Sequence, residues 1–259
     1  NKTTGSATYE TGSYGTHILS FDANIKLNEK LFVGTTSFYN YSKNDYKADH
    51  LPYRDPETGR TDYIRAKLFH NAFEQHSLEF FVQGRDLKWA DLIELKVNSY
   101  GLKKEIQNDP YSRARAFGEV YRTEKGNFIP SIKYKKYFLD NRLSLNQFLV
   151  YSRIDYELAD RAKNVSYDWL GQQHQTSSGS EMGSLELKDG ILLHKMSQFT
   201  SRTNLNYLIN NDFQIESNTV YSHYNRKTNG DDFNPDGTDY SKLISSLALN
   251  SWFFDRKLE

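Results

Sequence analysis

The sharpest local motif in the sequence is Asp-Phe-Asn-Pro-Asp-Gly at residues 232–237. Asp232, Asn234, Asp236 and Thr238 stand at alternate positions, and a glycine after the third allows the sharp turn that lets their oxygens converge on a hard cation. The twelfth position of such a calcium loop is Leu243, where an EF-hand has a bidentate Glu, so the match covers only the first half. The sequence predicts either a calcium site formed by these four residues or an exposed Asx/Gly turn that needs no metal.

Two long polar segments, residues 43–76 and 160–197, combine aromatic rings with cationic and amide groups. Such side chains can stack on a ligand and hydrogen-bond its polar edges, as small-molecule sites require. The alternative is that these aromatics only pack the loops together or form an interfacial ring in a membrane protein. The ligand-binding candidates are Tyr46, His50, Tyr53, Arg54, Tyr63, His70, Tyr167, Trp169 and His174.

Strand-like segments with a period of two separate these loops. In residues 17–27, Leu19, Phe21 and Ile25 fall on one face while the residues between them are polar, and residues 199–209 repeat the pattern. Weaker versions cover residues 6–14, 31–41, 77–84, 92–100, 118–138, 143–158, 213–226 and 243–254. We therefore expect about ten strands, several of them longer than the roughly 5–6 residues usual in soluble proteins.

The connections between these segments are of two kinds. Residues 28–30, 139–142 and 210–212 form tight turns, and residues 85–91 join the same set, whereas residues 43–76, 160–197 and 228–242 are long and irregular. Transmembrane β-barrels alternate short periplasmic turns with long extracellular loops in this way. With an even number of strands, both ends of the chain would lie on the side of the short turns. The polar positions that would then face the lumen are Arg202, Asn204, Asn206, Glu216, Asn218, Lys96 and Asn98.

Composition leaves this interpretation open. The 259 residues contain 33 Lys+Arg and 33 Asp+Glu, so charge gives no argument for binding nucleic acid. Aromatic residues make up 15% of the chain beside only 5 Pro, which favours β structure, and the absence of Cys excludes disulfides and thiolate metal sites. The mean hydropathy of -0.77 does not decide between membrane and solution, because a barrel strand meets lipid only at every second residue.

Several short segments carry a family resemblance. They are Gly-Ser-Tyr-Gly-Thr at residues 12–16, Phe-Tyr-Asn-Tyr at 38–41, Asp-Pro-Glu-Thr-Gly at 55–59, Lys-Glu-Ile-Gln at 104–107 and Pro-Ser-Ile-Lys-Tyr-Lys-Lys at 130–136. Each is weakly specific, but together they run along most of the chain. The combined pattern resembles the barrel of TonB-dependent outer-membrane receptors, particularly the Bacteroidetes type.

The resemblance implies an all-β, antiparallel, up-and-down transmembrane β-barrel. Because the family's barrel has about 22 strands and is closed by an N-terminal plug, residues 1–259 would be one segment of it: the N-terminal part, without the plug and without an internal domain boundary. The implied location is the outer membrane of a Gram-negative bacterium, in contact with its lipid. The implied function is capture of a scarce nutrient (siderophore-bound iron, a vitamin or a glycan) for import driven by an energy-coupling periplasmic protein acting through the plug.

Two other kinds of binding protein stay open, and catalysis finds little support. The chain could be a small closed outer-membrane barrel or a soluble β-sandwich with a binding or adhesive role. Leu31, Val33, Tyr39 and Tyr41 on one strand face favour a membrane. A ten-stranded outer-membrane protease would need a His beside an acidic partner, yet His70, His76 and His174 have no carboxylate at a suggestive spacing, and no catalytic sequence motif occurs. We expect a protein that is not an enzyme.

Overall fold

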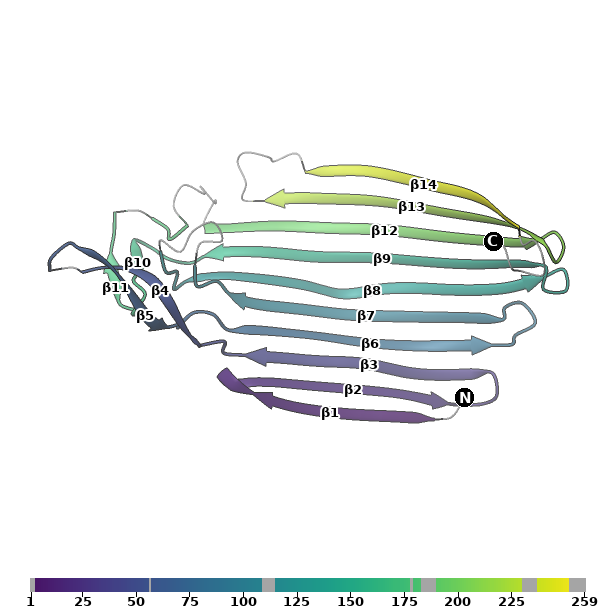
Figure 1. The fold of residues 1–259 in the computed structure, drawn as a ribbon, viewed down its shortest axis with the longest axis horizontal. Coiled ribbons are helices and arrows are strands. Elements are labelled where there is room, and N and C mark those ends of the chain that lie inside the picture. Colours follow the sequence, from purple (N-terminus) through teal and green to yellow (C-terminus); the bar gives the residue numbers. More distant parts are fainter. Residues whose placement is uncertain are drawn as a thin grey trace.

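The computed structural model describes residues 3–55, 57–108, 115–177, 179–182, 190–229 and 237–251, and within them the fold is all-β. One antiparallel sheet of ten strands follows the order of the chain (Figure 1). Its strands are β1 (Thr4–Gly12), β2 (Thr16–Lys26), β3 (Leu31–Ser42), β6 (Phe73–Arg85), β7 (Leu92–Glu105), β8 (Val120–Phe138), β9 (Leu143–Asp160), β12 (Ile191–Leu208), β13 (Phe213–Asn229) and β14 (Thr238–Ser251). The ten strands predicted from the sequence and their up-and-down order are confirmed.

Short turns occupy one end of the sheet. Asn28 Oδ1 accepts hydrogen bonds from the backbone N–H groups of Lys30 and Leu31, both at 2.9 Å. Asn210 Oδ1 likewise accepts hydrogen bonds from the backbone N–H groups of Asp212, just before β13, and Phe213, the first residue of β13, at 2.9 and 3.0 Å. An Asx side chain that satisfies the backbone in this way lets the chain reverse within a few residues. The predicted tight turns are therefore confirmed, and β1 begins and β14 ends at this turn end of the sheet.

The opposite end carries longer connections that contain strands of their own. β4 (Lys47–Arg54) pairs with β5 (Thr61–Lys67), and β10 (Val165–Tyr167) pairs with β11 (Gln173–Gln175), as two separate hairpins. A 3-10 turn (Ser13–Gly15) joins β1 to β2 at the same end. The prediction of irregular loops was wrong for the first two long segments, since they hold these hairpins and since β6 and β12 begin earlier than expected. In the third, residues 228–242, β13 and β14 extend to Asn229 and from Thr238, and residues 230–236 lie outside the described residues.

The pairing register sorts the side chains of the large sheet onto two faces, because directly paired residues of an antiparallel sheet point the same way. We call one the apolar face; the side chains that define it are Leu19, Phe21, Ile25, Val33, Leu78, Phe80, Val82, Leu95, Val97, Ile132, Leu149, Leu205, Ile215, Leu247 and Leu249. The opposite side is the polar face. Arg202, Asn204, Asn206, Glu216, Asn218, Lys96 and Asn98 all lie on the polar face, so the prediction that they share a side is confirmed.

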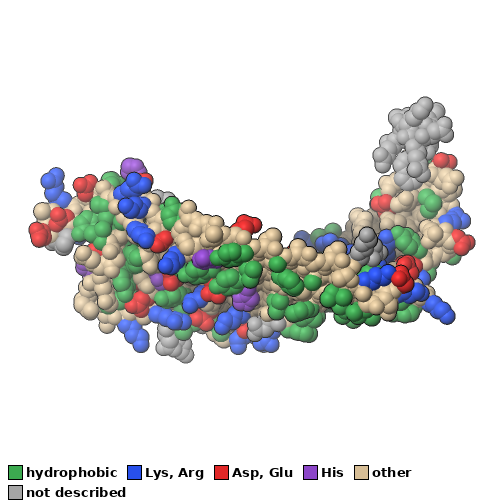
Figure 2. All heavy atoms as spheres, turned by 90° about the horizontal axis from the view of Figure 1, so that it is seen from below, with side chains coloured by type: hydrophobic (Ala, Val, Ile, Leu, Met, Phe, Trp, Pro, Cys, Tyr) green, Lys and Arg blue, Asp and Glu red, His purple; other side chains and the backbone are tan. Residues whose placement is uncertain are grey.

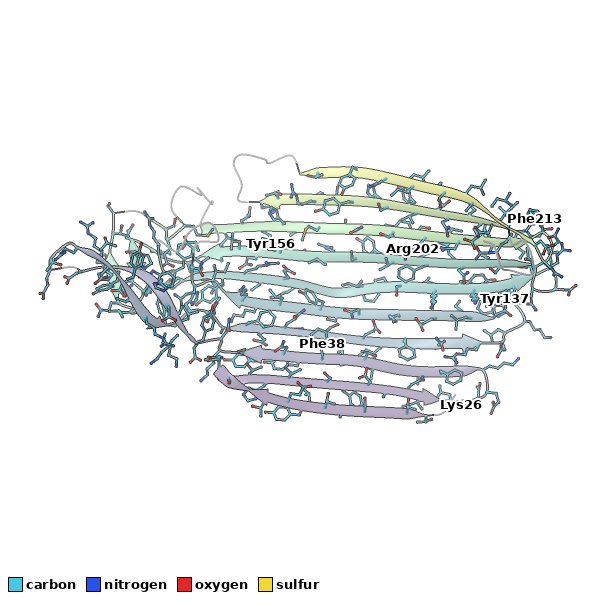
Figure 3. The ribbon with its side chains drawn as sticks, in the orientation of Figure 1. Lys26, Phe38, Tyr137, Tyr156, Arg202 and Phe213 are labelled. Carbon is cyan, nitrogen blue, oxygen red and sulfur yellow. The ribbon has the colours of Figure 1, made fainter. Side chains whose placement is uncertain are left out.

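On the polar face, hydrogen bonds and ion pairs connect neighbouring strands. Lys96 Nζ lies 2.9 Å from Glu79 Oε1, and Asn98 Nδ2 donates to Ser77 Oγ at 2.9 Å. Figure 3 places Arg202 in the middle of β12 and Tyr156 near the hairpin end of β9, both on this face. Some large aromatics, Phe38 among them, lie here as well. The face is therefore of mixed polarity.

The apolar face has no second layer of secondary structure against it in the described part of the chain. Phe80 is 55% exposed and Leu19 and Leu95 are each 50% exposed, although all three lie within long strands. Figure 2 shows hydrophobic side chains gathered along the strands, with Lys, Arg, Asp and Glu at both ends of the molecule and along its lower side in that view. Exposed apolar surface of this extent marks an interaction with another protein or a membrane.

Aromatic side chains border the apolar face at both ends. Toward the hairpin end, Tyr9 Oη lies 2.7 Å from His17 Nδ1, and the rings of His17 and Tyr41 stack at 6.4 Å. On β12 and β13 the rings of Phe199 and Tyr221 pack with centroids 6.3 Å apart, in the register rows that run through the middle of the sheet. Tyr134, Tyr207 and Phe213 lie on the same face near the short turns. Aromatic residues thus border the apolar face at the hairpin end on β1–β3 and near the short turns on β8, β12 and β13.

Candidate functional site

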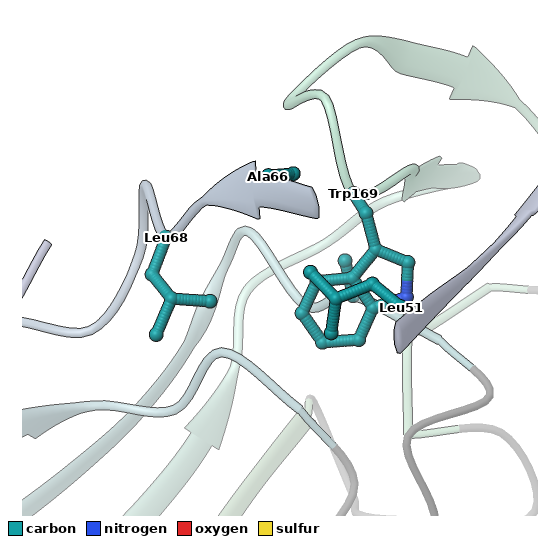
Figure 4. Packing of buried hydrophobic residues seen from close by; sticks show 5 residues of the cluster. Leu51, Ala66, Leu68 and Trp169 are labelled. Atoms are coloured by element: carbon teal, nitrogen blue, oxygen red, sulfur yellow. The ribbon is translucent and has the colours of Figure 1, made fainter. Parts of the chain in front are cut away.

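The two hairpins at the end of the sheet are held together by a small hydrophobic core (Figure 4). Leu51 from β4 is 1% exposed, and Trp169, from the turn between β10 and β11, is 3% exposed. Ala66, Leu68 and Ala116 complete the cluster. Full burial of a Leu side chain is worth about 1.5–3 kcal/mol. The cluster therefore fixes one hairpin against the other, although they are far apart in the sequence.

A buried amide joins this core to the sheet. The Gln107 side chain accepts hydrogen bonds from the backbone N–H groups of Phe69 and His70, at 2.8 and 2.6 Å, and donates to the Phe117 carbonyl at 3.1 Å. His70 Nε2 lies 2.8 Å from the carbonyl oxygen of Val120, at the start of β8. A buried amide with three such partners orients the segments around it. The hairpins are thereby tied to the ends of β7 and β8.

A buried carboxylate, Glu181 in the segment after β11, ties that segment to the residues just before β8. Its oxygens accept hydrogen bonds from the backbone N–H groups of Gly118 (2.9 and 3.1 Å) and Glu119 (2.7 Å). Burial raises the pKa of Glu181, and these hydrogen bonds oppose the shift. Tyr167 donates to Glu119 at 2.9 Å, and burial, followed by this contact, raises the pKa of Tyr167 to about 12. Both groups act here as structural ties.

Between the hairpins lies a cleft of about 850 Å³. One wall comes from the β4–β5 hairpin, the other from the β10–β11 hairpin, and Arg115 and Glu181 contribute from the segments beside β8. The volume is within the range of about 300–1,000 Å³ typical of small-molecule sites. The lining residues are Pro52, Tyr53, Arg54, Asp55, Gly59, Thr61, Arg115, Ala116, Ser166, Tyr167, Asp168, Trp169, His174, Thr176, Ser180 and Glu181.

The cleft brings together five of the nine ligand-binding candidates: Tyr53, Arg54, Tyr167, Trp169 and His174. Trp169 belongs to the hydrophobic core as well, and its Nε1 is buried with no hydrogen-bond partner in the described residues. Leaving such a donor unsatisfied costs about 1–3 kcal/mol. The sequence could not reveal that these five converge, because they come from segments more than a hundred residues apart.

The other four candidates lie outside the cleft. Tyr46 packs edge-on against Tyr14, with ring centroids 5.9 Å apart, and His50 packs against Tyr63 at 6.5 Å. His70 is 5% exposed and is fixed by its contacts with the ends of β7 and β8. These residues support the hairpins or cover their outer surface. Arg115, Asp168 and Glu181 line the cleft although sequence reasoning did not select them.

One expectation about histidines is corrected. His174 Nε2 lies 3.0 Å from Asp168 Oδ2, so this histidine does have a carboxylate partner. The other Asp168 oxygen accepts the backbone N–H groups of Leu170 and Gln172, both at 2.9 Å. Asp168 caps a turn of the chain, and after this turn His174 lies beside Asp168. A carboxylate six residues before a histidine, on either side of a hairpin turn, is the signal that was overlooked.

Calcium binding by the predicted loop stays a prediction. Asp232, Asn234 and Asp236 lie outside the described residues, and Thr238 is the first residue of β14. Within the described ranges, no group of three or more His, Asp or Glu side chains has an arrangement that could hold a metal ion.

No family model matches the chain, and no curated protein matches it. Among the residues that the structure describes, no helix is long and apolar enough to cross a membrane. Function is therefore inferred from the sheet and the cleft.

Proposed function

We propose that the protein forms part of the wall of an outer-membrane β-barrel, in a receptor that captures a scarce nutrient for energy-coupled import. The observation that carries this proposal is the apolar face, exposed along the strands and bordered by aromatic residues at both ends. Membrane barrels present such a band to lipid and a polar wall to the lumen. In this proposal the aqueous interior lies on the polar face, and the hairpins lie on the extracellular side.

The length of the apolar band supports a membrane location. On β2 and the turn after it, apolar side chains recur from Leu19 to Leu27, which corresponds to roughly 27 Å along a strand at about 3.4 Å per residue. A strand tilted by about 40° would cover some 20 Å of that as height, close to the band of about 25 Å in outer-membrane barrels. The aromatic borders extend the band by a few ångström more.

The two edges of the sheet support membership of a larger barrel. In the described residues, β1 pairs only with β2, and β14 pairs only with β13. An unpaired strand edge inside a membrane leaves backbone N–H and C=O groups without partners, at several kcal/mol for each group. We therefore place further barrel strands beside β1 and β14. A plug that contacts a periplasmic energy-coupling protein belongs to the same proposal and rests on the family resemblance alone.

The cleft between the hairpins supports the receptor role. It lies at the end opposite the short turns, it has an ordered hydrophobic base, and its walls present aromatic, cationic and hydroxyl groups. A site built on hairpins that a core holds in place loses little conformational freedom when a ligand binds. Such a cleft suits the capture of a nutrient before transport.

Cysteine labelling tests the membrane proposal, because the protein has no native Cys. Phe80→Cys puts a thiol on the apolar face, and Ser77→Cys puts a matched thiol on the polar face of the same strand. In outer-membrane vesicles, a lipid-soluble maleimide should label the Phe80→Cys protein while a charged maleimide should not. The charged reagent should label the Ser77→Cys protein. Equal labelling of both positions by the charged reagent, with the protein in the soluble fraction, would contradict the proposal.

A further inference from the structure

We infer that the ligand taken by the cleft is a saccharide that carries a carboxylate group. The inference rests on the proposed capture function and names its ligand class. Its basis is the way the charged side chains of the cleft are used: the acidic groups accept hydrogen bonds from the protein's own backbone, while the two arginines keep donors that no described residue uses.

The three carboxylates of the lining are engaged by the protein. Asp55 Oδ1 accepts the backbone N–H groups of Glu57 and Thr58, at 2.7 and 3.0 Å. Asp168 accepts two backbone N–H groups and contacts His174, and Glu181 accepts the N–H groups of Gly118 and Glu119. Each acid therefore fixes a turn or a segment of the site. Its negative charge is partly compensated by N–H dipoles before any ligand arrives.

The cationic groups of the lining have donors to spare. Arg54 on the β4–β5 hairpin uses only its Nε, in a 3.3 Å hydrogen bond to the Gly59 carbonyl, as far as the described residues go. Arg115, at the start of the segment that leads into β8, makes no hydrogen bond or ion pair with any described residue. Both side chains are exposed. A guanidinium group offers parallel N–H donors in a planar fork, which fits a carboxylate with two hydrogen bonds.

The rings beside these cations suit a sugar. Tyr53 and Tyr167 line the cleft, and Tyr167 is held firmly because its hydroxyl group bonds to Glu119 at 2.9 Å while its ring lies over Gly118. Fixed aromatic rings offer a flat apolar surface with a polar rim, at low cost in conformational entropy. The apolar C–H face of a pyranose can pack on such a ring while its carboxylate reaches the guanidinium groups. Hydroxyl groups in the walls complete a site for a polar ring compound.

Titration calorimetry with two matched pairs of probes tests the ligand class on the full protein purified in detergent. The first pair is trigalacturonate and its methyl ester, which lacks the carboxylate charges. The second pair is sialyllactose and lactose, which lacks the acidic sugar. We expect at least one acid to bind, and its neutral partner to bind roughly tenfold more weakly or worse, as the loss of a charge-assisted hydrogen-bond pair implies. Arg54→Gln and Arg115→Gln should each weaken binding of that acid by about tenfold.

Arg65→Gln is the matched control. Arg65 is on the same hairpin as Arg54, but it pairs with Asp49 at 3.1 Å and lies outside the cleft. Its substitution should leave the affinity unchanged within about twofold, in line with the small effect of surface pairs. If neither acid binds, if the neutral partners bind equally well, or if inorganic sulfate competes as strongly as the acid, the assignment of a carboxylate saccharide is overturned.

Cell fractionation separates this inference from the proposed function. If the protein is found in the outer membrane but binds neither acid, the ligand class fails and the membrane proposal stands. If the protein binds an acid through Arg54 and Arg115 but is found in a soluble compartment, the capture of the ligand stands and the barrel proposal fails.

Discussion

A charge placed on the apolar face should reveal which solvent that face meets. Phe80 lies in the middle of β6, paired with Thr35 and Val97, and is 55% exposed. If the face meets lipid, Phe80→Arg should cost about 2–4 kcal/mol for an Arg near the bilayer midplane. The lost transfer of half a Phe side chain adds about 1–1.5 kcal/mol, which gives a total of about 3–5 kcal/mol. If the face meets water, an exposed substitution of this kind should change the stability by about 0.5 kcal/mol or less.

Equilibrium unfolding in urea, with the protein folded into phospholipid vesicles and followed by Trp fluorescence, measures this cost. The matched control is Asn98→Arg, which puts the same charge at a similar depth on the neighbouring strand β7, but on the polar face beside Glu79. We expect the control to cost less than about 1 kcal/mol, as most surface substitutions do. Equal losses for the two variants, within about 0.5 kcal/mol, would refute the assignment of the apolar face to lipid.

Three more predictions concern the hairpins. Leu51→Ala should destabilise their core by about 2–5 kcal/mol, seen as faster proteolysis within residues 43–72 while the far-UV spectrum of the sheet is kept. Gly118→Ala puts a Cβ 2.5 Å from the Tyr167 ring. Displacing the ring should lower the pKa of Tyr167 from about 12 toward the ordinary tyrosine value of about 10, as an ultraviolet titration against Tyr167→Phe would show. Burial raises the pKa of Glu181. The contribution of Glu181 to the free energy of unfolding should therefore be complete below about pH 4.5 and should decline as the pH rises through the pKa of the folded state. Exchange of the Gly118 and Glu119 amides, corrected for intrinsic rates, should show this decline, and Glu181→Gln should remove it.

The large sheet could be predicted from the sequence because its signals are local. The alternation in residues 17–27 and the tight turn at Asn28 each depend on a few neighbouring residues, and the structure has β2 at Thr16–Lys26 with that turn after it. A strand exposes alternate residues to opposite sides whatever its partners are. For the same reason, the seven polar positions expected on one face were identified correctly, even though β7, β12 and β13 are not all neighbours.

The hairpin site could be predicted only in part, because it depends on contacts between distant segments. The register of β4 and β5 shifts between Ala48 and Leu51, which breaks the alternation that would have revealed the hairpin. Trp169 reads as a ligand-binding residue in an exposed loop, yet it packs into the core with Leu51. Arg115 carries no local signal at all. Composition identified the segments that build a site, and only the fold shows which side chains share one cleft.

The apolar face is interrupted over its second half by uncharged polar residues, and the way they pair bears on the lipid proposal. Gln147, Thr203, Thr219 and Ser245 form one row across β9, β12, β13 and β14. Thr203 donates to Gln147 at 2.6 Å, Gln147 donates to Ser201 at 3.0 Å, and the hydroxyl oxygens of Thr219 and Ser245 lie 3.2 Å apart. In water these groups could form hydrogen bonds with the solvent, whereas in hydrocarbon an unpaired amide or hydroxyl costs about 4–8 kcal/mol. The row contains no charged side chain, and its members bond to one another or to Ser201 on the same face. This is the arrangement that a bilayer demands of polar groups on a barrel's outer wall.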